Sequence, residues 1–489
     1  MIRMLGGPKR LCDGLTRRDL LAVGSLGLMG LGAGRAPAAA PTSGLPGFGR
    51  AKACILLYLY GSPSQLETFD PKPDAPSGIR GEFGSIASSV PGVNVCDRLP
   101  MLARVMDKLA VVRTVTHPYP IHGVAYALSG IPRIEVAEEL NPRHPAHYPF
   151  IGSVVDHADR VARGPAADVS RNLLLPWSFG SRRVGEVPRA GPYAGFLGGA
   201  YDPIATEFVG RGTVKARKTL QDQTWDELEL YRGITPESRF RLGGTPEESI
   251  AIDRLDRRRT LLEQLESARR GLDVGGTGID RHRSMAHALL GSEKIRRAFD
   301  LDREPPGTRD SYGMTLFGQA ALTARRLVEA GGRFVTVFWD EYGLAGSGWD
   351  THWDHFSRMK DELLPGLDRT LSGLLVDLDA RGMLDETLVL CLSEHGRTPT
   401  LSTAKGGGRD HWSRCYSAVL AGGGIGRGRV VGRSDKVAGE PADRPVSPKD
   451  LLATAYHLLG VDPSLMLIDR LGRPVPAAGD GVVIPELLA

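Results

Sequence analysis

Short, continuous apolar runs recur along the chain and alternate with longer stretches of helical period. The clearest runs occupy residues 54–60, 109–115, 333–339, 387–392 and 417–420. Apolar runs of this length between turn-forming residues are typical of strands that are buried on both faces. Helical stretches at residues 315–330 and 356–381 precede two of the runs, and Ser447 with Pro448 begins another helix that runs to Leu459. This alternation predicts an α/β fold with a mostly parallel central sheet and helices on both faces.

The middle of the chain interrupts this pattern. Residues 131–310 are rich in Arg, Gly and Pro, and they contain one strongly charged helical stretch at residues 246–270. We interpret them as an insertion that caps or flanks a site within a domain spanning residues 51–475. A separate interaction domain is the alternative interpretation.

The N-terminal segment has the order of regions that is typical of a signal peptide. Arg17 and Arg18 directly precede an apolar run at residues 20–34, and small residues follow this run. We therefore expect a twin-arginine signal peptide over residues 1–40 and a linker over residues 41–50. The alternative is an uncleaved anchor, which the short run disfavours because a spanning helix needs about 20 apolar residues. The signal predicts a periplasmic or extracellular protein that meets the twin-arginine translocase during export.

Charge and cysteine content narrow the function classes. Residues 1–38 contain six basic and two acidic residues, a surplus equal to the formal net charge of +4 of the whole chain. The mature protein is therefore close to neutral, and its composition indicates no nucleic-acid partner. Four cysteines remain, which are too few for a disulfide scaffold, leave one bridge open and lack metal-ligand spacing. They are Cys54, Cys96, Cys391 and Cys415.

Residue types that bind metal ions follow the predicted strands. The carboxyl ends of parallel strands meet at one edge of the sheet, where such folds bind their ligands. Imidazole and carboxylate groups are the ligands of Zn²⁺, Mn²⁺ and related ions. The candidates are Glu67 and Asp70 after the first run, His122 after the second, Asp350 and His352 after the third, Glu394 and His395 after the fourth, and His411 shortly beyond. Their joint occurrence at predicted strand ends indicates a shared metal site.

The spacing within this set predicts how the groups could cooperate. Asp350 and His352 are two residues apart, so extended backbone places both side chains on one side. Glu394 and His395 are adjacent and could reach two neighbouring ions at a strand end. Two ions about 4 Å apart would activate a water or hydroxyl nucleophile and stabilise the leaving oxygen. Arg397 could hold an anionic oxygen of a phosphate or sulfate ester.

Each motif alone also has a purely structural interpretation. An Asp-x-His sequence in a loop is usually a capped turn. Glu394 could pair with Arg397, and Glu67 and Asp70 could simply form a turn before Pro71. The prediction of a site therefore depends on the motifs occurring together.

Several motifs together resemble those of one known family. They lie in residues 61–73, 348–352, 393–399 and 408–412 and in the helix around residues 450–460. The set is similar to that of the DUF1501-type proteins, which carry twin-arginine signals and are placed in the alkaline phosphatase and sulfatase-like superfamily. The resemblance implies an alkaline phosphatase-like fold for residues 51–475, with the insertion at about residues 131–310.

The resemblance also implies one or two divalent metal ions, of Zn, Mn, Ca or Mg. The first implied set is Asp350, His352 and His411, and the second is Glu394 and His395 with Glu67 or Asp70. His395 replaces the usual Phe of the family, which brings this segment closer to the Asp-His-Gly of alkaline phosphatases. Glu67 replaces the usual Asp and has one more methylene of reach.

The nucleophile of the superfamily has no counterpart in the expected place. A Ser, Thr or modified Cys stands there at a helix N-terminus after the second strand, whereas residues 118–123 contain none of these. The Cys-x-Pro-x-Arg motif of sulfatases is absent from the whole chain. We therefore expect His122 to be a ligand, a general acid or a phosphoacceptor, or else metal-activated water to attack directly.

The leading hypothesis is an exported metal-dependent hydrolase of phosphate or related sulfate esters. Its substrate would be an anionic ester, with polysaccharide-linked and lipid-linked esters as candidates. The first alternative is a non-catalytic binding or surface protein that retains the fold. The second is a phosphomutase or a phosphonate-cleaving enzyme on the same fold.

Overall fold

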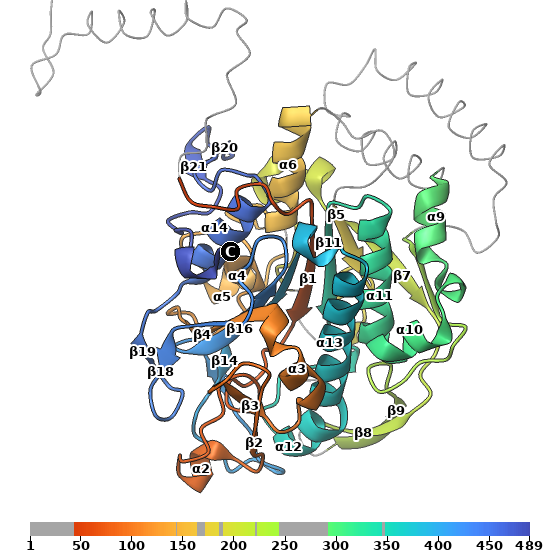
Figure 1. Cartoon of the computed structure of the whole chain (residues 1–489), viewed down its shortest axis with the longest axis vertical. Coiled ribbons are helices and arrows are strands. Elements are labelled where there is room, and N and C mark those ends of the chain that lie inside the picture. Colours follow the sequence, from red (N-terminus) through yellow and green to blue (C-terminus); the bar gives the residue numbers. More distant parts are fainter. Residues whose placement is uncertain are drawn as a thin grey trace, which may run out of the picture. The chain divides into compact units, whose positions relative to one another are not determined.

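A nine-stranded mixed sheet lies at the centre of the computed structural model, which describes residues 44–142, 144–163, 172–184, 189–220, 223–243, 292–344 and 348–489 (Figure 1). The strand order is β10-β7-β5-β11-β1-β13-β16-β4-β17. In chain order the strands are β1 (Ala53–Leu59), β4 (Leu109–Val115), β5 (Asn172–Leu175), β7 (Ile204–Val209), β10 (Arg239–Leu242), β11 (Phe334–Trp339), β13 (Thr387–Leu392), β16 (Tyr416–Ala421) and β17 (Arg429–Val431). Their pairings show that β10 and β16 run against the direction of the other strands.

All five apolar runs that predicted strands form strands of this sheet. β1 is buried along its whole length because it lies between β11 and β13 at the middle of the sheet. The prediction of a mostly parallel sheet is confirmed. The fifth run, now β16, is antiparallel to both of its neighbours. Only loops and the short β14–β15 pair separate it from β13, and antiparallel strands need no crossover helix.

Helices cover both faces of the sheet, as predicted (Figure 1). Ile55 and Leu57 of β1 pack on one side with α3 (Pro100–Arg104), α9 (Glu293–Phe299), α10 (Pro306–Tyr312), α11 (Leu316–Glu329) and α13 (Leu364–Ala380). Leu56 and Tyr58 pack on the other side with α4 (Val124–Ala127), α6 (Ile151–Arg163) and α14 (Pro448–Leu458). Successive strand residues point to opposite faces, so one apolar run supplies both layers of the core.

Two helices begin where the sequence predicts. The Thr315 hydroxyl accepts a hydrogen bond from the Gly318 amide at the start of α11, at 3.1 Å. Ser447 and Asp450 form a capping box at the start of α14. The long stretch predicted at residues 356–381 divides into α12 (His355–Arg358), a π-helical turn (Met359–Leu363) and α13.

The middle of the chain contributes directly to the sheet. We expected residues 131–310 to be an insertion that caps or flanks the site; their described part supplies β5, β7 and β10 to the sheet. They also form the hairpin of β8 (Lys215–Leu220) and β9 (Gln223–Leu228) and the short helix α5 (Val136–Glu139). The run in β5 is only four residues long, too short to stand out in an Arg- and Gly-rich stretch.

The remaining helices and strands are short, and these strands form separate two-stranded sheets. They are α2 (Ser77–Arg80), β2 (Ser85–Ala87) with β3 (Asn94–Cys96), β6 (Arg183–Val184) with β12 (Gly343–Leu344), β14 (Gly396–Arg397) with β15 (His411–Trp412), β18 (Arg433–Ser434) with β19 (Pro441–Asp443), and β20 (Met466–Ile468) with β21 (Pro474–Pro476). The β14–β15 pair holds His411 opposite Arg397.

Two predicted segments lie outside the residues that the structure describes. They are the predicted signal peptide at residues 1–40 and the predicted helical stretch at residues 246–270. Within the described part, no helix is both long and apolar enough to cross a membrane. The four cysteines considered for a bridge are all free and buried in the core, so the structure pairs none of them.

Candidate metal centre

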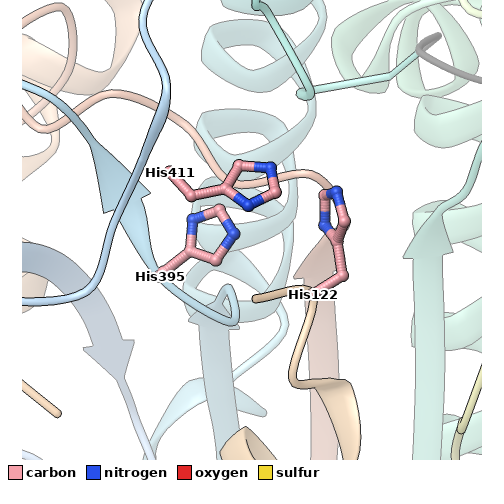
Figure 2. Close-up of side chains that lie close together, drawn as sticks. All are labelled: His122, His395 and His411. Atoms are coloured by element: carbon pink, nitrogen blue, oxygen red, sulfur yellow. The ribbon is translucent and has the colours of Figure 1, made fainter. Parts of the chain in front are cut away.

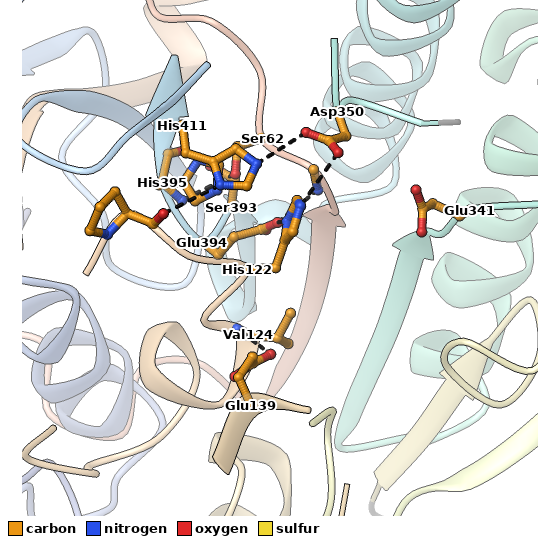
Figure 3. A network of polar contacts seen from close by, with 12 residues as sticks. Ser62, His122, Val124, Glu139, Glu341, Asp350, Ser393, Glu394, His395 and His411 are labelled. Atoms are coloured by element: carbon orange, nitrogen blue, oxygen red, sulfur yellow. Dashed lines mark hydrogen bonds and ion pairs between the residues drawn. The ribbon is translucent and has the colours of Figure 1, made fainter. Parts of the chain in front are cut away.

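Loops at the carboxyl ends of β4, β11 and β13 carry a group of side chains that converge on one point (Figure 3). His122 precedes α4, Asp350 and His352 lie between β11 and α12, His395 follows β13, and His411 begins β15. We call these five residues the histidine cluster. Since β1, β4, β11 and β13 run in the same direction, their carboxyl ends meet at one edge of the sheet.

Asp350, His352 and His411 form the outer group of the cluster. The Asp350 Oδ1 atom is 3.1 Å from His352 Nε2 and 3.3 Å from His411 Nε2. The two Nε2 atoms are 3.1 Å apart. Ligand atoms about 2.0 to 2.1 Å from a tetrahedrally coordinated Zn²⁺ lie about 3.3 Å from one another. The spacing of the outer group therefore fits one divalent ion.

His122 and His395 form an inner group with the same His411 (Figure 2). The ring centres of His122 and His395 lie 4.4 and 4.5 Å from that of His411, and 5.6 Å from each other. His395 is fully buried, and its Nε2 atom has no hydrogen-bond partner. An imidazole nitrogen buried without a partner is costly, unless a cation is its partner.

All four histidines have an oxygen atom beside Nδ1. The pairs are His122 with Glu394 Oε1 at 3.1 Å, His352 with Asp410 Oδ1 at 2.7 Å, His395 with the Gly396 carbonyl at 2.7 Å, and His411 with the Pro120 carbonyl at 3.3 Å. Carbonyl and carboxylate oxygens accept hydrogen bonds, so these contacts place a proton on Nδ1 and direct Nε2 into the cluster. Metal-binding histidines are typically oriented by such partners.

The electrostatic surroundings divide the histidines into two kinds. Burial holds the pKa of His395 well below its usual value, and burial also lowers the pKa of His411. Burial opposes a charge on His122 as well, but Asp350 and Glu394 outweigh it and raise the pKa of His122 to about 9. His395 and His411 are therefore neutral at pH 7 and present lone pairs, whereas His122 retains a second proton.

Arg397 lies beneath the cluster and is fully buried. Its Nη2 group donates to Asp350 Oδ1 at 2.5 Å and to the Gly61 carbonyl, and its Nε and Nη1 groups donate to the Ser62 and Arg409 carbonyls at 3.1 Å. We expected Arg397 to hold an anionic oxygen of the substrate. It is instead fully engaged within the protein, where its charge fixes Asp350 and keeps the pKa of that carboxyl low despite burial.

Glu67 and Asp70, expected to complete a second ion site, are not members of the cluster. The Glu67 oxygens contact Arg409 Nη2 at 2.6 Å and His355 Nε2 at 3.3 Å. Asp70 pairs with Lys72 at 2.9 Å and accepts a hydrogen bond from the Ser434 hydroxyl. Both carboxylates are buried, and both are occupied by donors from other segments.

Glu394 supports the cluster from behind. Its Oε1 atom accepts hydrogen bonds from the Gly61 amide at 2.8 Å and from His122 Nδ1 at 3.1 Å. Both contacts use Oε1, which orients His122, while Glu394 Oε2 is buried without a hydrogen-bond partner. Gly61 also allows the Asp350 backbone to approach closely, because it has a φ of 92° and a Cβ atom there would lie 2.4 Å from the Asp350 nitrogen.

The sequence did not predict two of the groups that orient the histidines. Asp410 and the Pro120 carbonyl orient His352 and His411 across 58 and 291 residues of sequence. The adjacency of Asp410 and His411 was visible, but it could equally be a surface loop. The Ser129 hydroxyl, which follows the expected nucleophile position in the chain, donates to the Ala125 carbonyl at 2.6 Å and is buried.

Two solved structures are similar to the chain over most of its length. The PsFucS1 sulfatase from Pseudoalteromonas sp. has 13% identity and a TM-score of 0.39, with 90% of this chain and 72% of that one covered. The phosphonate monoester hydrolase SpPMH from Silicibacter pomeroyi has 12% identity and a TM-score of 0.31, with 89% and 76% covered. These likenesses are distant, and no match was found among curated proteins. Residues 51–488 match the family described as "Protein of unknown function (DUF1501)", and the chain belongs to this family.

Proposed function

We propose that this protein is an exported metal-dependent hydrolase of phosphate or sulfate esters. One observation carries the proposal. Four imidazoles and one carboxylate converge, and each imidazole is held at Nδ1 by an oxygen, so that Nε2 faces the others. Lone pairs face this point from Asp350, His395 and His411, and a cation held between them would be stabilising.

We assign one divalent ion to the outer group, namely Asp350, His352 and His411. His411 belongs to both the outer and the inner group. Its Nδ1 is bound to the Pro120 carbonyl, so it has only Nε2 to offer and can serve one ion at a time. When bound, the ion would supply Lewis-acid polarisation of an ester oxygen and would neutralise developing negative charge. Ligands of N and O type favour Zn²⁺ or Mn²⁺.

His122 is suited to act as the general acid. Glu394 holds its Nδ1, and its Nε2 lies 3.4 Å from Asp350 Oδ2, at the edge of the outer group. A proton held at Nε2 could pass to the ester oxygen as it leaves. Neutralisation of Asp350 by a bound cation would lower the pKa of His122 from about 9 toward the neutral range, where proton transfer is most efficient.

The proposed reaction is attack by water. The water oxygen forms a bond to phosphorus or sulfur, the bond to the ester oxygen breaks, and that oxygen takes the proton from His122. The water proton is released to solvent. The substrate would approach from the outer side, since 29% of the His352 side chain is exposed but only 7% of the His122 side chain. Polysaccharide-linked and lipid-linked esters remain the candidate substrates.

The test combines metal analysis with a screen of ester substrates. The purified protein would be loaded with Zn²⁺ or Mn²⁺ and assayed with aryl phosphate monoesters, phosphate diesters, phosphonate monoesters and sulfate esters. We expect hydrolysis of at least one class, its loss in chelator, and its loss in Asp350→Asn and His411→Ala. His457→Gln is the matched control, because His457 is a buried histidine that bonds to the Pro46 carbonyl, outside the cluster.

The outcomes separate the hypotheses. Hydrolysis that persists in chelator, or in Asp350→Asn, would overturn the proposed role of the metal. Metal binding without turnover of any ester class would instead favour the non-catalytic binding protein. The engaged Arg397 and the missing hydroxyl nucleophile are the observations that motivate this second candidate.

Export is part of the proposal and rests on the Arg17-Arg18 motif and the apolar run after it. We expect the mature protein to accumulate outside the cytoplasm with an N-terminus close to residue 41. Replacing both arginines by lysine should block export through the twin-arginine route. Undiminished export of the double variant would contradict this part of the proposal.

A further inference from the structure

Three fully buried ionisable side chains lie beside the histidine cluster: Glu67, His355 and Arg409. Their side chains are at most 1% exposed. The carboxylate of Glu67 lies between the other two, 2.6 Å from Arg409 Nη2 and 3.3 Å from His355 Nε2. We call these three residues the buried brace. None of them belongs to the proposed ion site.

One arm of the brace reaches the segment that carries His411. Arg409 directly precedes Asp410 and His411 in the chain. Its guanidinium also donates to the Thr398 carbonyl at 3.0 Å, and its amide donates to the Thr351 carbonyl at 3.1 Å. Arg409 therefore joins the two ligand-bearing segments through its backbone while Glu67 compensates its buried charge.

The other arm reaches the segment that carries Asp350 and His352. Thr351 lies between these two residues, and its hydroxyl is 2.7 Å from His355 Nδ1. The far side of the His355 ring faces Glu67. A change at Glu67 would therefore disturb both sides of the outer group at once. The Arg409 carbonyl adds a third link, because it accepts a hydrogen bond from Arg397, which holds Asp350.

Asp70 provides a comparison within the same loop. It is as buried as Glu67, and it is also surrounded by donors: Lys72, Arg113 and the Ser434 hydroxyl. None of these donors lies in a segment that carries a member of the histidine cluster. Burial and ion pairing alone are therefore shared by the two carboxylates, whereas contact with both ligand-bearing segments distinguishes Glu67.

We propose that Glu67 is a positioning residue for the metal centre. Through Arg409 and His355 it holds residues 350–352 against residues 409–411, so that Asp350, His352 and His411 keep the spacing of one ion. This inference rests on the proposed metal centre and makes no use of ester turnover. Residues that orient ligands from the second layer typically change metal affinity by about 10- to 100-fold when they are replaced.

The test measures Zn²⁺ or Mn²⁺ affinity of the full-length protein by calorimetric titration, together with thermal unfolding in chelator. We expect Glu67→Gln to weaken metal binding by about 10- to 100-fold. Glu67→Asp keeps the charge and should recover part of the affinity. Asp70→Asn should lower thermal stability by a similar amount to Glu67→Gln and leave metal affinity within about threefold of the wild type.

Three results would overturn the inference: wild-type affinity in Glu67→Gln, an equal loss of affinity in Asp70→Asn, or no gain in Glu67→Asp over Glu67→Gln. Should Glu67→Gln fail to fold, His355→Gln replaces it in the same titration, since it breaks one arm and leaves the charge pair intact. A wild-type protein that binds no metal refutes the metal centre and the inference together. Metal binding without ester hydrolysis refutes only the hydrolase.

Discussion

The histidine cluster and the buried brace are adjacent, but the polar groups in the two regions have different kinds of partner. In the brace, the charge of Arg409 meets Glu67, and its Nη1 and Nη2 groups also donate to the Thr398 and Ile79 carbonyl oxygens. In the cluster, imidazole nitrogens and a carboxylate face one another, and the Nε2 atoms of His352 and His411 are 3.1 Å apart. A buried group with matched partners contributes to the fold, whereas imidazole nitrogens and a carboxylate that converge on one point are suited to hold a cation.

The brace and the histidine cluster also differ in the exposure of their side chains to solvent. The brace is sealed from solvent, while Asp350, His352 and His411 have 13%, 29% and 21% of their side chains exposed. Charged side chains that are excluded from solvent can interact only with neighbouring groups of the protein. Side chains at an opening can also meet a ligand from solution.

Removal of His411 should have the largest effect, because both groups of the cluster contain it. We expect His411→Ala to weaken metal binding by more than about 100-fold, beyond the usual effect of an orienting residue. Calorimetric titration with Zn²⁺ measures this, with His457→Gln as the control. A smaller loss than in Glu67→Gln would reverse the roles that we assign to the cluster and the brace.

Asp410 offers a milder test on the exposed side of the cluster. Its carboxylate lies 2.7 Å from His352 Nδ1, and 65% of its side chain is exposed. We expect Asp410→Asn to weaken metal binding by about 10- to 100-fold while thermal stability in chelator stays unchanged. A loss of stability without a loss of affinity would place Asp410 with the structural residues instead.

The brace should titrate as a structural ion pair. Burial alone would raise the pKa of Glu67, but Arg409 and His355 outweigh it and lower the value from 4.5 to about 2. A carboxyl whose pKa is lowered by folding stabilises the protein above its unfolded value and loses this contribution as pH falls. Between pH 5 and pH 3 we expect the wild type to lose about 2 kcal/mol of stability relative to Glu67→Gln. Denaturant unfolding at the two pH values measures this difference, and equal losses in both proteins would contradict it.

The cluster should also respond to pH, through metal affinity, whereas the brace responds through folding stability. The proton on His122, with its pKa of about 9, competes with a cation beside Asp350. Metal affinity should therefore rise by up to about tenfold per pH unit between pH 7 and pH 9, as binding releases this proton. Titrations in buffers of different ionisation enthalpy count the released protons. A flat profile, or an unchanged slope in His122→Gln, would show that His122 does not compete with the ion.

The strands at the centre of the sheet could be predicted because each is a continuous apolar run. Turns bound the strands β1, β4, β11 and β13. A continuous apolar run predicts that such a strand is buried, whichever strands lie beside it. The direction of β16 could not be predicted in this way, since apolar periodicity carries no polarity. β5 was missed because three apolar residues in an Arg- and Gly-rich region give too little signal.

The members of the histidine cluster were all visible as residue types at predicted strand ends. Glu67, Asp70 and Arg397 had the same signature, yet each is satisfied by other partners. Glu394 was also placed correctly in the sequence, but it orients His122 and is not part of the outer group. Residue type at a strand end thus predicts proximity to the site, and the local hydrogen bonds decide the role.

The sequence alone determined the class of fold, the edge of the sheet that carries the site, and the chemistry of the side chains gathered there. These follow from local properties, namely the period of apolar residues and the ligands that each residue type can offer. Only the tertiary structure decided which residues share an ion and which form a brace. The deciding contacts join residues 58 positions apart for His352 and Asp410 and 342 apart for Glu67 and Arg409. Strand order in the sheet sets such contacts, and a pattern read along one segment contains no information about it.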